Sequence, residues 1–240
     1  MNPLMKYYLI SLLLLWIGLG TSVSAEEMPI TVDCPLGGGV ANGIETLAMY
    51  TRATGLDGRP YGNHTEVHPP PECVDNGFIV YKDDFTEAEL LHVEKYVLSK
   101  EYQTMWRTGV PEFYRLAKIY EYLELPISGY AYFYLIATWN DYAYQKDRYE
   151  YYAREAIRAF VAAIKQMESS AQGHSERYVE FHYLLVELYR RVREFDNAQE
   201  KLDWIKQTNL DTSFLDPLII EFQDYLISQG DSDNHMMSEG

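Results

Sequence analysis

The sequence predicts a mainly α-helical protein: a tetratricopeptide-like antiparallel helical array with a small, turn-rich N-terminal lobe that contains short β-strands. Three observations support this fold class. Residues 34–77 are dense in glycine and proline, which mark turns. From Thr86 onward, apolar residues recur at helical spacing. The breaks between these periodic segments are short, and short loops between amphipathic helices make consecutive helices antiparallel.

Residues 1–25 have the composition of a secretory signal peptide. Lys6 supplies a short positive region, an apolar run extends from Tyr7 to Leu19, and Val23 and Ala25 occupy the small-residue positions of a cleavage site. The alternative is an uncleaved membrane anchor, but the run is shorter than the about 20 apolar residues that span a bilayer. We therefore expect cleavage, export, and no membrane insertion of the mature chain.

Residues 26–84 are predicted to form the small lobe. Short β-favouring runs lie between its turns, and the clearest is Phe78–Tyr81, directly after the tight-turn signal Asn76-Gly77. The lobe ends where "DDFTEAEL" begins, because Thr86 and Glu89 form a capping box that starts a helix.

Residues 85–229 are predicted to form the helical-repeat domain. Apolar spacing, Pro111 as a first-turn residue and polar breaks define its helices. We expect helices over residues 86–98, 100–107, 111–123, 130–144, 147–167, 176–193, 197–208 and 214–228. The remaining residues, 230–240, are polar, and we expect a disordered tail there.

The strongest repeat signal lies in the helices predicted at 176–193 and 197–208. Leu185, Tyr189, Ala198 and Leu202 have the spacing of a tetratricopeptide-type repeat, although the Trp and Gly of that pattern are absent. A small residue at Ala198 would let the second helix cross closely over the first, while Leu185 and Tyr189 fill the groove between them.

Charge and cysteine content restrict the partners and the compartment. The net charge is −16, and it becomes −17 once Lys6 is removed with the signal peptide. This charge repels nucleic acid and anionic lipid and favours a basic protein or peptide as partner. Cys34 and Cys73 are the only cysteines. In an exported chain an even number of cysteines predicts a disulfide.

Each cysteine begins a turn that looks like half of a zinc knuckle. In "CPLGGG" the motif Cys-x-x-Cys-Gly is matched by Cys34, but Gly37 stands at the second cysteine position. In "CVDNGF" it is matched by Cys73 and Gly77, with Asn76 at the second cysteine position. A structural zinc site takes four such ligands, so each turn has lost one of its two.

These turns, with "DDFTEAEL" and "LLVELYRRVREFDNAQEKL", give the chain a resemblance to a bacterial family of unknown function. In that family a two-knuckle, zinc-ribbon-like lobe precedes tetratricopeptide-like helices. The resemblance implies the same fold here, with a degenerate lobe, and the periplasm of a Gram-negative bacterium or secretion as the location. It also implies that Cys34 and Cys73 face each other, so that a disulfide replaces the metal and closes a loop of about 40 residues.

The alternative for the lobe is a retained zinc site. Cys34, His64, His68 and Cys73 would then make a Cys₂His₂ ligand set, and the protein would be a zinc-binding module. The histidines lie in a proline- and glycine-rich loop rather than at a knuckle, so we favour the disulfide and expect no cofactor. No catalytic motif is evident, so we expect no enzyme activity; an enzyme of unrecognised type is the remaining alternative.

Aromatic residues are concentrated in residues 130–152, on more helical faces than a core can cover. Tyrosine and tryptophan suit partner interfaces, which favours a groove on the concave side of the helical array with Tyr132, Trp139 and Tyr142 as anchors. The alternative is that most of these rings fill internal gaps. We therefore predict a non-catalytic adaptor or scaffold that binds a protein or peptide. The sequence predicts no particular oligomeric state.

Overall fold

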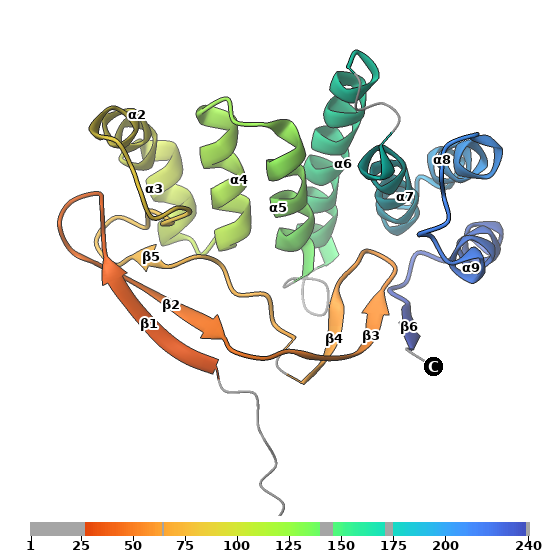
Figure 1. Ribbon diagram of the computed structural model, residues 1–240, viewed down its shortest axis with the longest axis horizontal. Helices are drawn as coiled ribbons and strands as arrows, with labels where there is room; N and C mark the ends of the chain where they lie inside the picture. Colours follow the sequence, from red (N-terminus) through yellow and green to blue (C-terminus); the bar gives the residue numbers. More distant parts are fainter. Residues whose placement is uncertain (1–26, 64, 140–145, 171–174, 239–240) are drawn as a thin grey trace, which may run out of the picture.

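The computed structural model describes residues 27–63, 65–139, 146–170 and 175–238. The expected signal peptide lies outside this part of the chain. Within it, eight α-helices follow a segment of short strands, so the mainly helical class is confirmed at this level. Figure 1 shows the helices side by side, with the N-terminal segment extended beneath them.

The N-terminal strands form two separate three-stranded sheets rather than one lobe. The first sheet has the order β1-β2-β5, and the second has the order β4-β3-β6; all pairs are antiparallel. The strands are β1 (Glu27–Asp33), β2 (Val40–Thr46), β3 (Tyr50–Gly55), β4 (Pro60–Asn63), β5 (Glu72–Cys73) and β6 (Met236–Ser238). The predicted strand at 78–81 is reduced to an isolated bridge between Glu72 and Ile79.

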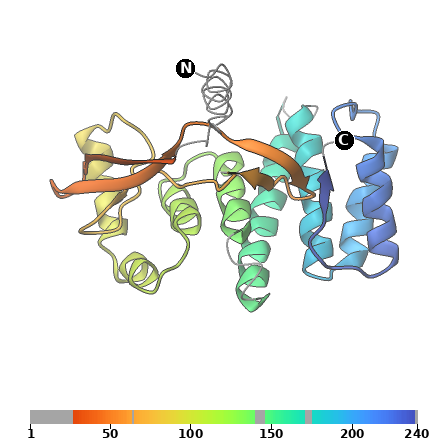
Figure 2. The ribbon, with the colours of Figure 1, turned by 90° about the horizontal axis from the view of Figure 1, so that it is seen from below.

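We call residues 27–84 the strap, because they run along the helical array instead of folding into a compact lobe. Seen from below, the strap passes from the first helices to the last (Figure 2). The short strands expected at 26–84 are thus present in two sheets, and the second sheet includes a strand from the C-terminal residues, a pairing that a local sequence pattern cannot indicate.

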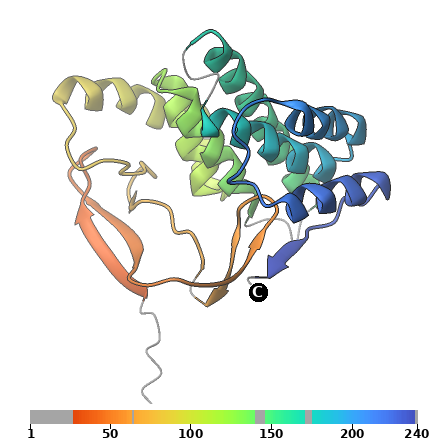
Figure 3. The same cartoon turned by 45° about the vertical axis from the view of Figure 1, so that its right-hand side comes forward.

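The helices pack in chain order, each against the next (Figure 3). They are α2 (Glu87–Val97), α3 (Lys100–Arg107), α4 (Glu112–Tyr122), α5 (Ile127–Trp139), α6 (Lys146–Glu168), α7 (Glu176–Arg191), α8 (Phe195–Gln207) and α9 (Pro217–Ser228). The predicted capping box of Thr86 and Glu89 begins α2. The expected helix boundaries agree with these to within a few residues wherever the chain is described.

Most of the core lies between the helices. Leu185 on α7 and Ala198 and Leu202 on α8 are fully buried, at the positions that the repeat spacing singled out. A smaller cluster surrounds Cys34 and Cys73 and packs on α2 and α3. The first sheet is thus attached to one end of the helical array through its own apolar core.

The C-terminal residues are ordered up to Ser238, where the sequence predicts a disordered tail. Nη1 of the buried Arg190 donates to the carbonyl oxygens of Asp231 and Asp233, at 2.8 and 3.0 Å. Beyond them, β6 pairs with β3. The tail has little apolar surface, but it supplies hydrogen-bond acceptors that a buried guanidinium requires. Its own composition contains no sign of this role.

Candidate binding groove

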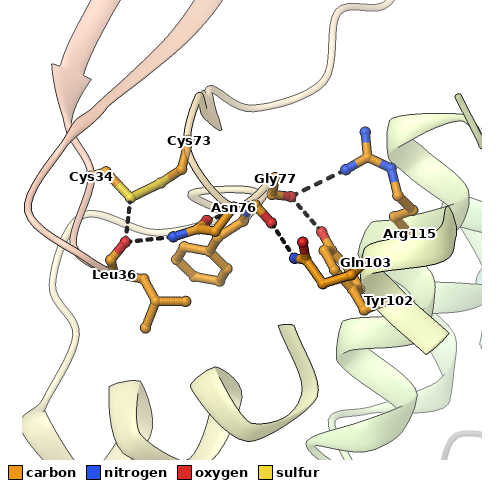
Figure 4. The surroundings of a disulfide bond; sticks show 9 residues. Cys34, Leu36, Cys73, Asn76, Gly77, Tyr102, Gln103 and Arg115 are labelled. Atoms are coloured by element: carbon orange, nitrogen blue, oxygen red, sulfur yellow. Dashed lines mark hydrogen bonds between the residues drawn. A yellow bond between two sulfur atoms is a disulfide. The ribbon is translucent and has the colours of Figure 1, made fainter. Parts of the chain in front are cut away.

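At the disulfide end of the strap, two turns are joined by a covalent bond and by hydrogen bonds. Cys34 and Cys73 are joined, with their Cα atoms 5.5 Å apart, as the sequence predicts. The amide of Asn76, three residues after Cys73, donates to the Leu36 carbonyl oxygen at 2.7 Å (Figure 4). Its Oδ1 atom accepts the Phe78 backbone N–H at 2.9 Å. The two turns are therefore linked twice, once covalently and once through Asn76.

The disulfide uses both cysteine sulfur atoms, so neither is available as a thiolate ligand for zinc. His68 pairs with Glu27 at 3.3 Å instead of approaching the cysteines, and His64 lies outside the described residues. Among the residues that the structure describes, no group of three or more His, Cys, Asp or Glu side chains is arranged to hold a metal ion.

The second turn is fixed to the helices through its backbone. The Gly77 carbonyl oxygen accepts the Tyr102 hydroxyl at 2.6 Å and Nη1 of Arg115 at 3.1 Å. Next to it, Nε2 of Gln103 donates to the Asn76 carbonyl oxygen at 2.8 Å (Figure 4). Buried carbonyl groups seldom lack a partner, so these bonds fix where the strap meets α3 and α4.

Arg115 also pairs with Glu72 of β5, and both oxygens of that carboxylate are used. Nη2 of Arg115 binds one, and the Trp106 indole N–H donates to the other at 2.8 Å. Arg115 is buried, one turn from Ile119 on the apolar face of α4. A cation on an apolar stripe is the sequence signal that could have indicated this contact, because a buried charge needs a partner.

At its other end the strap presents Arg59 from the turn between β3 and β4. Gly58 has φ +81°, which an L side chain rarely adopts, and the Gly55 N–H donates to the Arg59 carbonyl oxygen at 2.7 Å. Oδ1 of Asp57 accepts the Arg59 backbone N–H at 3.1 Å. Burial and the nearby Glu187 raise the pKa of the Asp57 carboxyl.

Arg59 connects the strap to the C-terminal end of α5. Its Nη1 atom donates to the Trp139 carbonyl oxygen, and its guanidinium lies 5.2 Å from the centre of the Tyr61 ring. Arginine suits this position because its planar group stacks and donates at the same time. Within the described residues, Arg59 forms no ion pair.

Between these two attachments, the strap and the helices line two adjoining open cavities that share Glu66 and Val67. The first has a volume of about 680 Å³, and its lining includes Arg59, Tyr61, Thr65, Ile136 and Trp139. The second has a volume of about 410 Å³, and its lining includes Asn42, Ile44, His68, Pro69, Pro70, Glu72 and Glu112. We call the two cavities together the strap groove. Its lining combines a few apolar side chains with polar groups and several carboxylates.

Two of the three predicted anchor residues lie within the described part of the chain, and of these two Trp139 lines this groove and Tyr132 does not. The Trp139 indole nitrogen is buried and has no hydrogen-bond partner within the described part of the chain. Tyr132 instead packs between helices, with its ring centre 5.6 Å from that of Phe160 and 5.5 Å from that of Phe181. Tyr142 lies outside the described residues.

Most of the described tyrosines near Tyr132 fill the interior, which agrees with the alternative that the sequence left open. Tyr130, Tyr134, Tyr149 and Tyr152 are buried, and Tyr151 is exposed. Burial and the Glu180 carboxylate raise the pKa of the Tyr132 phenol. The aromatic surplus therefore contributes to helix packing, while Tyr132, which is partly buried, stays a predicted anchor.

Comparisons with protein-family models, curated proteins and solved structures found no match, so the resemblance to a two-knuckle bacterial family stays a prediction. Within the described ranges, no helix combines the length and the apolar character needed to cross a bilayer.

Proposed function

We propose that this is an exported, non-catalytic interaction protein that holds an extended segment of a basic partner protein in the strap groove. The observation that carries the proposal is the pair of adjoining cavities along which Trp139, Ile136 and Val67 provide apolar surface. A groove of this form suits an extended peptide, whose successive side chains can occupy successive cavities.

The charge of the groove supports a basic partner. Glu66 is exposed and belongs to both cavities, and Glu112 lines the second. No lysine or arginine lines the second cavity among the described residues. Together with the net charge of −16, this arrangement would attract a cationic segment and make binding weaken as salt is added.

The fold supports a scaffold role through its helical layer, which we propose to be tetratricopeptide-like. The burial of Leu185, Ala198 and Leu202 supports a close crossing of α7 over α8 of that kind. Export is supported by the disulfide, because such bonds persist in oxidising compartments.

The test is peptide binding by the protein without residues 1–25. A synthetic library of random dodecapeptides with free C-termini would be selected against it, and the selected peptides would be measured by calorimetry. We expect enrichment of lysine and arginine. Trp139→Ala and Glu66→Lys should each weaken binding tenfold or more, about 1.4 kcal/mol, without loss of the fold.

Two matched variants serve as controls. Tyr225 is 59% exposed on α9, and Glu221 is exposed on the same helix, so Tyr225→Ala and Glu221→Lys change the same properties away from the groove. Peptides that bind the groove variants normally, or that lose affinity equally in the controls, would contradict the proposal.

A further inference from the structure

Arg59 is confined to one of the two cavities of the strap groove. The first cavity is lined by Arg59, Thr65 and Trp139, and also by Glu27 and Glu66. The second cavity is lined by Glu66, Glu72, Glu112 and His68, with no lysine or arginine within the described residues. A ligand that crosses both cavities would therefore meet carboxylates along its length and a guanidinium only in the first cavity.

Among the described residues, Arg59 has N–H groups that are free to bind a carboxylate. One of its nitrogen atoms is used by the Trp139 carbonyl oxygen, and the Tyr61 ring supports its plane. The remaining N–H groups have no partner among the described residues, and a guanidinium presents such groups in the geometry that a carboxylate accepts. The Trp139 N–H also lacks a partner among the described residues, but it is buried away from solvent, so Arg59 is the donor on which the inference rests.

The first cavity also contains two carboxylates. The Glu27 carboxylate lies 3.3 Å from His68, which lines the second cavity, and Glu66 is common to both cavities. Arg59 instead contacts the Tyr61 ring and the Trp139 carbonyl oxygen, and within the described residues it forms no ion pair with either acid.

We propose that the first cavity binds the C-terminal residue of the partner chain, with its free carboxylate on Arg59 and its apolar side chain against Ile136, Val67 and Trp139. A terminal residue carries both groups on one carbon atom and so occupies donors and apolar wall together. An aspartate or glutamate within a chain offers the carboxylate alone. A lysine or arginine earlier in the partner's sequence then pairs with Glu66. This inference rests on the proposed function.

The probe is a pool of acetylated hexapeptides with lysine at the third position, leucine at the sixth and the other positions randomised among uncharged residues. Three forms are compared: a free C-terminal acid, a C-terminal amide, and an amide with glutamate in place of leucine. Fluorescence anisotropy with the protein lacking residues 1–25 gives each affinity. We expect the free acid to bind at least tenfold more tightly than either amide.

Variants assign this preference to the cavity. Arg59→Gln should abolish the difference between acid and amide while leaving the affinity for the amide unchanged. Arg52→Gln is the matched control, because Arg52 is exposed on the same hairpin and also lies over a tyrosine ring, 5.8 Å from the centre of Tyr50. Trp139→Phe keeps an aromatic wall but makes it smaller, so it should weaken binding of the acid and the amides alike and leave the preference for the acid unchanged. Circular dichroism monitors folding, and Arg59→Lys, with an intermediate preference, replaces Arg59→Gln if that variant unfolds.

Each outcome decides one claim. Equal binding of acid and amide would overturn the carboxylate inference and leave the proposed function standing. Binding of the glutamate amide as tight as that of the acid would show that a side-chain carboxylate suffices, which also overturns it. Absence of binding by all three forms would contradict the proposed function together with the inference.

Discussion

The two ends of the strap are fastened in different ways. At the first sheet, a disulfide and the Asn76 amide join two neighbouring turns, and the backbone of Gly77 docks on α3 and α4. At the second sheet there is no covalent link: β3 pairs with β6, and the residues before β6 bind the buried Arg190. One end thus depends on a crosslink, and the other on buried charge.

The buried charge network is the more vulnerable of the two. Arg190 and Glu187 are both fully buried, with Nη2 of Arg190 2.7 and 2.8 Å from the carboxylate oxygens. Nε2 of Gln223 donates to the same carboxylate at 2.9 Å. Removing one partner of such a pair leaves an uncompensated charge, which costs more than the pair itself contributes.

The largest effect is therefore expected from Glu187→Ala, which leaves Arg190 buried beside fewer acceptors. The free energy of unfolding in urea should fall by about 3–5 kcal/mol. Hydrogen exchange should accelerate in β3 and β6 before it changes near Cys73. Glu221→Lys on the surface of α9 is the control. A loss below about 1 kcal/mol would mean that the tail is not held by this network.

The next largest effect is expected at the disulfide. Cys73→Ala should lower the free energy of unfolding by about 2–5 kcal/mol, and Cys34→Ala should have the same effect because both variants remove one bond. Exchange should now accelerate in β1 and β2 and not in β6. The intact protein without residues 1–25 should contain no free thiol before reduction. Two free thiols with one bound zinc ion would contradict this prediction.

A third variant tests the stability of the helical layer, for comparison with the two ends of the strap. Ala198 is fully buried on α8, so Ala198→Leu should cost about 1–3 kcal/mol through overpacking. Because no strap residue is involved, neither sheet should open selectively. Unchanged thermal stability would show that α7 and α8 do not cross closely at this position.

The smallest expected effect is a pH dependence of the free energy of unfolding, and it involves neither end of the strap. Burial lowers the pKa of His182 from its ordinary 6.5 to about 4, where its ring stacks on Trp204 with the centres 3.7 Å apart. The unfolded chain therefore binds the proton more tightly, and stability is complete above pH 6.5 and is lost as the pH falls toward 4.

Between pH 7 and pH 5.5 this residue should account for a loss of about 1 kcal/mol. His182→Phe cannot bind a proton, so the same measurement on that variant should give a flatter pH profile. Identical slopes in the two proteins would show that His182 does not titrate with unfolding.

The comparison also explains what could be predicted from the sequence. The capping box at Thr86 and the pairing of Cys34 with Cys73 were predictable, because their signals are local or depend on a count of two. The order of the tail was not, since it depends on Arg190, about 40 residues earlier in the chain. In the same way the strand expected at 78–81 is only a bridge, because its partner is the two-residue β5.

The lining of the strap groove was predictable only in part. Trp139 and Tyr132 belong to the same aromatic pattern and are both partly buried, but Trp139 lines the strap groove, and Tyr132 packs against Phe160 and Phe181. Apolar spacing cannot separate these two cases when several faces of a helix are covered. Arg59, which contacts Trp139 across 80 positions of sequence, carried no local signal at all.

The central claim is that a partner segment lies between the strap and α5. Hydrogen exchange of the protein without residues 1–25, with and without a saturating amount of the free-acid hexapeptide pool, tests it most directly. The account predicts slower exchange in residues 59–63, 65–67 and 136–139, with no change on the outer side of α9. Protection confined to α8 and α9, with unchanged exchange along the strap, would contradict it.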